Sequence, residues 1–367
     1  MKLFIKLLSI VWIGFLFFKS SVYAQEVNIK LRPHLQTSYS AEYSFGNVLD
    51  QRENKELLGE VFYVTKNRIP VKFEKSLETS LAAYYNSQLE FDQSTSTDIQ
   101  VRILEMSIQE SPNHATKLYE GELKIKLAFY LKGKLDPVHL VDYSNLVKYQ
   151  RTLNSINKLQ EIINEYLDES LRYFDSWMKT QTGTNRNLAK SVALNVFYNL
   201  PESTSDTVYY DINQPLKWEY FKDRPSVSSK YNATITCSFS VEGSAQMVDG
   251  IIQQNILIRA YMLPNQSWVK NPDDYGINHE QKHFDVVKIV VDRLIHRLKN
   301  LDLDTDFYEA KINTFYFDAY REMNRLQELY DNQSQNGLNK EAQERWNIWI
   351  VKGLKGDWEE LEKQLAK

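Results

Sequence analysis

The chain has 367 residues, which is long enough for two domains of ordinary size. Its 44 basic residues against 48 acidic ones give a formal net charge of −4 and form no basic stripe, which argues against nucleic acid as a partner. The single cysteine, Cys237, cannot form an internal disulfide, and its place in an alternating run predicts a small buried side chain rather than a catalytic thiol.

The first residues have the layout of a secretory signal peptide. Lys2 and Lys6 precede an apolar run over residues 7–18, and the small Ala24 stands at the expected cleavage position. The run is too short to span a bilayer comfortably, although an uncleaved anchor is the alternative. We therefore expect residues 1–24 to be removed and the protein to be exported to the periplasm, the cell surface or the medium, with no transmembrane span after cleavage.

The next part, residues 25–200, is predicted to form an envelope-type α+β domain. Alternating apolar residues predict strands, and amphipathic stripes predict helices, one of them opened by Pro70. The expected strands cover residues 58–65, 99–103, 123–131 and 140–151, and the expected helices cover residues 70–84 and 154–178. The simplest arrangement is an α/β sandwich with an antiparallel meander, in which the helices pack on one face of a largely antiparallel sheet.

Polar stretches near residue 200 predict a domain boundary, and residues 207–367 are expected to form the second domain. Two alternating runs, residues 233–241 and 256–262, predict a small sheet. A turn at residues 264–268 leads into a first helix, and two further helices are expected over residues 306–331 and 340–365. Asn336-Gly337 between them indicates a helix stop. The expected class of the whole chain is α+β, with a small sheet and three helices in the second domain.

The first of these helices carries INHEQKHFD over residues 277–285, which contains the H-E-x-x-H signature of zinc hydrolases. His279 and His283 are one helical turn apart, so both imidazoles can reach one ion. Glu280 lies beside them and can act as the general base towards a water molecule. The sequence therefore predicts a Zn²⁺ site with Glu280 as its catalytic residue.

The helical wheel places both histidines on the same side as Val286, Val290 and Leu294, so they should face the interior of the protein. Burying two imidazoles without a partner is costly, and a metal ion is an efficient partner. The alternative is a pair of histidines at the edge of the core whose hydrogen bonds are satisfied by neighbouring groups.

A zinc hydrolase needs a third protein ligand. No histidine follows His296, which lies several turns further along the same helix, and Asp285 points about 200° away from His283 at 100° per residue. The remaining candidates are carboxylates of the next helical segment, namely Glu309, Glu322, Glu328 and Asp331.

Several stretches of the second domain occur together in a fixed order. They are LKWEYF (216–221), SWV (267–269), NHEQKHFD (278–285), YDNQSQNGLN (330–339) and QERW (343–346). This ordered set covers about residues 207–358 and resembles a bacterial domain family of unknown function described as secreted zinc-dependent proteases. The resemblance implies a zincin-like fold, a peptidase activity, two zinc-binding histidines at positions 279 and 283, and Glu280 as the base.

The chain departs from that family at two positions. The family has a His-Gly pair where this chain has Asn336 and Gly337, and that histidine is a natural third ligand. Lys282 stands where the family tends to have glycine. The third ligand is therefore expected to be Asp331 or Asn336, of which asparagine is the weaker zinc ligand.

These observations predict an exported zinc-dependent metallopeptidase that acts on a peptide or protein, with a first domain that positions substrate or docks to an envelope protein. Two alternatives stay open. One is a non-catalytic envelope binding protein on a degenerate metallopeptidase fold, and the other is a hydrolase of a non-peptide bond such as a cell-wall amide.

Overall fold

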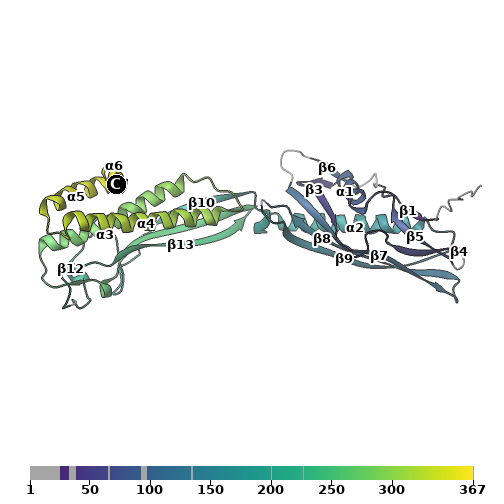
Figure 1. The fold of residues 1–367 in the computed structure, drawn as a ribbon, viewed down its shortest axis with the longest axis horizontal. Coiled ribbons are helices and arrows are strands. Elements are labelled where there is room, and N and C mark those ends of the chain that lie inside the picture. Colours follow the sequence, from purple (N-terminus) through teal and green to yellow (C-terminus); the bar gives the residue numbers. More distant parts are fainter. Residues whose placement is uncertain are drawn as a thin grey trace, which may run out of the picture. The chain divides into compact units, whose positions relative to one another are not determined.

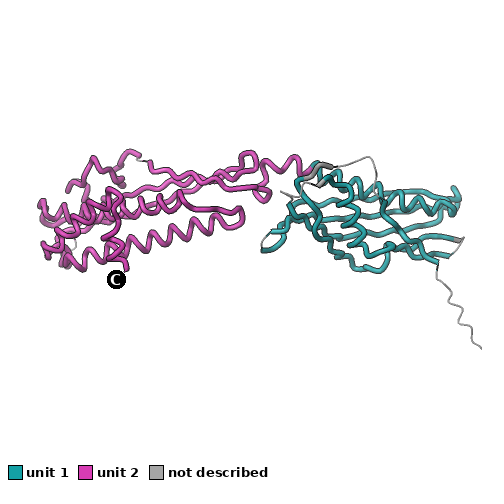
Figure 2. Tube along the Cα trace, turned by 90° about the horizontal axis from the view of Figure 1, so that it is seen from above, with its two compact units in different colours: residues 1–176 teal, residues 177–367 magenta. Residues whose placement is uncertain are grey.

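The computed structural model describes residues 25–32, 39–64, 67–91, 97–133, 135–199, 201–225 and 227–366. The expected signal peptide, residues 1–24, lies outside the described residues. The chain forms two compact units, with residues up to 176 in unit 1 and residues from 177 in unit 2 (Figure 2). Both units combine helices with sheets, which confirms the predicted α+β class.

The two units divide earlier than the expected boundary near residue 200. The division falls within the helix α2 (Lys158–Gln181). Residues 191–198 fall within the expected first domain, but they form a strand that was not predicted, β10 (Ser191–Tyr198), which pairs along its whole length with β14 (Ile251–Met262) of unit 2. The polar residues after β10 are therefore a connection inside unit 2 and not a linker between domains.

Unit 1 is built on a seven-stranded mixed sheet (Figure 1). The expected antiparallel meander is confirmed in its three long strands, while the β1–β5, β3–β7 and β4–β7 pairs are parallel. Strands β2 and β6 form a separate parallel pair. The strands are β1 (Val27–Ile29), β2 (Tyr39–Ala41), β3 (Tyr43–Asp50), β4 (Gly59–Val64), β5 (Asn67–Phe73), β6 (Leu89–Phe91), β7 (Thr97–Asn113), β8 (Leu118–Leu131) and β9 (Val138–Arg151).

The helix expected to open at Pro70 begins later. Pro70 lies inside β5, opposite Glu60 of β4, and the helix α1 (Leu77–Ser87) starts after Ser76. The side chain of Ser76 accepts a hydrogen bond from the Thr79 N–H at 3.2 Å and so caps the helix. The residue that marks the start of this helix is therefore Ser76 and not Pro70.

Both helices of unit 1 pack on the same face of its sheet, as expected. Phe45 of β3 contacts Tyr85 of α1 at 4.9 Å and Phe174 of α2 at 5.8 Å between ring centroids. Phe174 also stacks on Phe129 of β8 at 4.3 Å. This buried aromatic cluster joins two helices and two strands into one core.

We expect Phe174→Ala to lower the free energy of unfolding of unit 1 by about 3–5 kcal/mol, because Phe174 is fully buried and its removal leaves a cavity. The matched control is Tyr173→Ala on the same helix, since Tyr173 is 42% exposed. Denaturant titration of both variants measures the difference. Equal losses of stability would contradict the position of Phe174 in the core.

Unit 2 contains a four-stranded sheet centred on β14. The strand β13 (Cys237–Val248) is antiparallel to β14 over its full length, so β10 and the short β11 (Val208–Tyr209) share the other edge of β14. A separate antiparallel pair joins β12 (Ala233–Thr234) to β15 (Trp268–Val269). The small sheet was predicted, but β13 and β14 extend well beyond the two alternating runs.

The hairpin between β13 and β14 explains this extension. Val248 pairs with Ile251, and the two residues between them, Asp249 and Gly250, both have positive φ, at 51° and 78°. Asp-Gly suits a two-residue hairpin turn, because glycine adopts positive φ without strain and aspartate tolerates it. The turn thus sets the register of two long strands.

The described residues of unit 2 form four α-helices, namely α3 (Asp274–Lys299), α4 (Tyr308–Ser334), α5 (Lys340–Gly353) and α6 (Glu359–Leu365). Helices α3 and α4 pack against the strands of the sheet, and α5 and α6 pack against α3 and α4. Three were expected; the third divides into α5 and α6 around Gly356, whose φ is 89°. Asn336-Gly337 ends α4 as predicted, with both residues at positive φ. Among the described residues, no helix has the length and apolar character needed to cross a bilayer.

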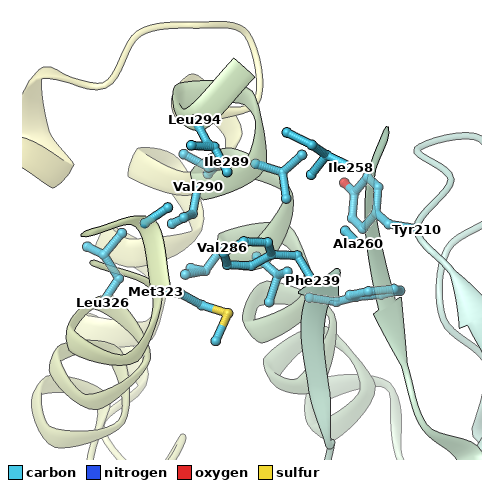
Figure 3. Packing of buried hydrophobic residues seen from close by; sticks show 14 of the residues in the cluster. Tyr210, Phe239, Ile258, Ala260, Val286, Ile289, Val290, Leu294, Met323 and Leu326 are labelled. Carbon is cyan, nitrogen blue, oxygen red and sulfur yellow. The ribbon is translucent and has the colours of Figure 1, made fainter. Parts of the chain in front are cut away.

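The core of unit 2 lies on both sides of α3. Val286, Ile289 and Val290 of this helix are fully buried. They pack between β14 and α4, and Met323 is among the α4 residues in this core (Figure 3). Burial on two sides fixes the rotation of α3 about its axis, which in turn fixes where its two histidines point.

Candidate metal centre

The H-E-x-x-H motif occupies the first turns of α3. The carboxylate of Asp273 caps this helix by accepting the Gly276 N–H at 2.6 Å, and Asp274 adds negative charge at the positive end of the helix dipole. His279 and His283 follow on one face, with ring centroids 4.9 Å apart. Both are buried, as the helical wheel predicted.

Asp331 completes the cluster from α4. Its Oδ1 lies 2.9 Å from Nε2 of His283 and 3.4 Å from Nε2 of His279. One ligand atom from each of these three residues lies within 4.8 Å of the others, so the cluster could hold a metal ion. Of the third ligands considered from the sequence, Asp331 is the one that the fold brings to both histidines.

The residues of this cluster fit a divalent cation. Oδ1 of Asp331 is buried, and within the described part of the chain no group donates a well-directed hydrogen bond to it. Two imidazole nitrogens and one carboxylate oxygen form a common three-ligand set for catalytic zinc. Because a buried carboxylate oxygen needs a partner, a cation between the three side chains would satisfy it.

The charges of the cluster are strongly coupled. Burial alone would raise the pKa of Asp331, but the two imidazoles beside it hold that pKa well below its ordinary value. Burial alone would lower the pKa of His283, yet the neighbouring Asp331 and Glu280 raise it above its ordinary value. Asp331 and Glu280 therefore favour positive charge at the position of the two imidazoles.

One aromatic side chain and two amide side chains contact the rings of the two histidines. Tyr330 stacks on His279 at 4.8 Å between centroids and meets the edge of His283 at the same distance. Nδ1 of His279 lies 2.9 Å from Oε1 of Gln343, and Nδ1 of His283 contacts Oε1 of Gln327. The hydrogen bonds expected in the alternative to a metal site are thus present on the Nδ1 side of each ring, while the Nε2 atoms face Oδ1 of Asp331.

Glu280 is buried next to the cluster. Its Oε2 accepts a hydrogen bond from the backbone N–H of Ile235 at 2.9 Å, just after β12. Burial raises the pKa of Glu280 above its ordinary value, against the effect of the two imidazoles. A carboxylate with a raised pKa beside a metal site is suited to accept a proton near neutral pH.

The other candidate ligands have different partners. Glu309 pairs with Arg186, Glu322 with Arg293 and Arg297, and Glu328 with Arg325. Asp285 is buried and accepts a hydrogen bond from the hydroxyl of Tyr210 at 3.0 Å, while His296 contacts Trp358. The position of Asp285 agrees with the direction expected from the helical wheel.

The two departures from the family pattern have separate structural roles. Asn336 lines the same cleft as the histidines, and its backbone N–H donates to the carbonyl of Asp331 at 2.8 Å. Lys282 is buried on another face of α3, where its Nζ lies 2.6 Å from Oδ2 of Asp285. Asn336 thus lies near the cluster, while Lys282 belongs to the packing of the helix.

A cleft of about 900 Å³ opens over the cluster. Its walls are the segment around β12, the start of α3, and one face of α4 with the turn that follows it. Cys237 also lines the cleft; it is half-buried, and burial raises the pKa of its thiol. The alternating run correctly predicted a strand position for Cys237, but the prediction of a buried side chain was wrong, because the residue is half-buried at the cleft.

Sequence reasoning did not find Gln327, Gln343 or the backbone of Ile235. Gln343 is the first residue of the QERW stretch. That stretch contributed to the resemblance, but it suggested no role for Gln343. Gln327 and Asp331 are four residues apart on α4, a spacing that places them on one face, but glutamine is too common on helices to be informative alone.

No family model, no curated protein and no solved structure matches the chain. The assignment of this site therefore depends on its own geometry.

Proposed function

We propose that the protein is an exported zinc-dependent metallopeptidase whose metal is held by His279, His283 and Asp331. The observation that carries the proposal is the convergence of Nε2 of both histidines on one carboxylate oxygen, with Glu280 in the adjacent position. The ordered stretches described from the sequence support the same function, and the apolar run before Ala24 supports export.

Zinc at such a site would polarise a carbonyl group and acidify a water molecule. Glu280 takes the proton of the attacking water and passes it to the leaving amine. The N–H of Ile235 holds the Glu280 carboxylate in place for this transfer.

The cleft supports a peptide or protein substrate. Its volume lies within the range of ligand sites, and backbone and amide groups such as those of Asn232, Asn324 and Gln335 line it. Amide groups can pair with the N–H and C=O groups of a bound peptide. In this proposal, unit 1 positions the substrate or docks to an envelope protein.

Two observations favour an enzyme over a non-catalytic binding protein. Three side chains that could each give one ligand atom lie together, and Glu280 accepts a backbone hydrogen bond, with no ion pair to a Lys or Arg side chain among the described residues.

The metal content of the purified protein tests this proposal. We expect near-stoichiometric zinc by plasma mass spectrometry, and we expect His283→Ala to lose both the zinc and the cleavage of an unstructured protein substrate. His296→Ala is the matched control, because His296 lies on the same helix but contacts Trp358. Wild-type protein that takes up no zinc after incubation with it would overturn the metallopeptidase proposal.

A further inference from the structure

The two glutamines behind the histidines form a pair. Gln327 comes from α4 and Gln343 from α5, and each presents its Oε1 to the Nδ1 atom of one imidazole. A side-chain amide can be turned either way, so its role depends on what its nitrogen contacts.

The orientation of Gln327 is fixed by a backbone carbonyl. Its Nε2 donates to the carbonyl oxygen of His283 at 3.1 Å. A carbonyl oxygen can only accept, so the amide nitrogen must lie on that side and Oε1 must face Nδ1 of His283. Because Oε1 also can only accept, Nδ1 has to carry the hydrogen.

The orientation of Gln343 is fixed by a longer chain of hydrogen bonds. The amide nitrogen of Asn347 donates to the Glu344 carboxylate at 3.3 Å, which leaves Oδ1 of Asn347 to accept from Nε2 of Gln343 at 3.0 Å. Nε2 of Gln343 also donates to the hydroxyl of Tyr330. Oε1 of Gln343 therefore accepts from Nδ1 of His279.

We propose that Gln327 and Gln343 are positioning residues that hold His283 and His279 in the Nδ1–H tautomer, so that both Nε2 lone pairs are directed to one metal ion. The proposal rests on the metal site described above and does not depend on peptide hydrolysis. In this tautomer three lone pairs, two from nitrogen and one from Oδ1 of Asp331, face one another, and a cation stabilises that arrangement.

The choice of glutamine has a chemical consequence. A ligating histidine is often held by a carboxylate, which adds negative charge and makes the imidazole a stronger donor to the metal. Glutamine accepts the same hydrogen bond without charge. The glutamines thus orient the rings while leaving more positive charge on the metal, and Gln343→Glu is expected to bind zinc at least as tightly as the wild type.

The tautomers can be measured directly in the wild-type protein. In ¹⁵N-histidine spectra of the zinc-free full chain, recorded in alkaline buffer where imidazole is neutral, we expect the proton of His279 and His283 on Nδ1. A proton on Nε2 of either ring would overturn the proposal for that ring. This measurement decides the question even if the protein takes up no zinc, so the two proposals fail separately.

Zinc affinity gives the second test, with a chromophoric chelator as competitor. Gln327→Met and Gln343→Met should each weaken Zn²⁺ binding by about 10- to 100-fold, with a changed Co²⁺ absorption spectrum. Gln333→Met is the matched control, because Gln333 is also a half-buried residue of α4 but accepts its hydrogen bond from Trp346.

The outcomes separate positioning from a merely structural role. Loss of affinity in both methionine variants, with Gln343→Glu retaining it and Gln333→Met close to the wild type, supports the proposal. Unchanged affinity in the methionine variants, or a loss in Gln343→Glu as large as in Gln343→Met, overturns it.

Discussion

Glu280→Gln is expected to abolish peptide hydrolysis while the zinc content stays at the wild-type level. The amide has the shape of the carboxylate, and its oxygen can still accept the Ile235 N–H, but it cannot take a proton. Loss of a general base lowers rates by about 10²- to 10⁴-fold. The measurement is kcat/KM on a fluorogenic peptide, with zinc content determined on the same sample.

The control for this variant is Glu328→Gln, which removes an exposed carboxylate of α4 that pairs with Arg325. It should leave the rate unchanged. If Glu280→Gln kept its full rate with zinc bound, the role assigned to Glu280 would be wrong, and the proton acceptor would have to be another group lining the cleft.

Asp331→Ala is expected to abolish stoichiometric zinc binding, because it removes the group that faces both histidines. The loss of zinc affinity should exceed the roughly 100-fold effect of changes in groups that only hydrogen-bond to a metal ligand. Asn336→Ala is the matched control, since Asn336 lines the same cleft in the position where the resembling family has histidine. Zinc affinity by chelator competition measures both.

The reverse result would identify a different third ligand. If Asn336→Ala released the zinc and Asp331→Ala retained it, the segment after α4 would supply the ligand, as the resemblance implies. Asp331→Asn guards against misfolding, because it keeps the shape of the side chain while removing its charge. Circular dichroism of each variant shows whether the fold is retained.

The parts of the site that depend on local periodicity could be predicted from the sequence. The spacing of His279 and His283 and their direction towards the core follow from helix geometry alone. Asp331 could be named only as one of several carboxylates, because its approach to α3 depends on how α4 packs. Gln343 joins the site from a third helix, and helical geometry within one segment carries no information about such a contact.

The fold shows the same division between local and tertiary information. Alternation predicted the meander of unit 1, and Asn336-Gly337 predicted the end of α4. The position of β10 could not be predicted, because its partner β14 lies beyond the polar stretch that suggested a boundary. Pro70 misled the prediction because proline starts helices often, but here the serine cap six residues later begins the helix.

The assembly of the site from α3, α4 and α5 links metal binding to folding. In an unfolded chain the two histidines of one short segment are not joined by Asp331, so in the proposed site an ion would bind the folded unit 2 far more tightly than the unfolded chain. Mass action then adds about 2.7 kcal/mol to the stability of the folded state when free zinc exceeds its dissociation constant 100-fold. If the proposed export takes place in the unfolded state, the chain would gain this support only in its final compartment, where the supply of zinc would influence how long it survives proteolysis.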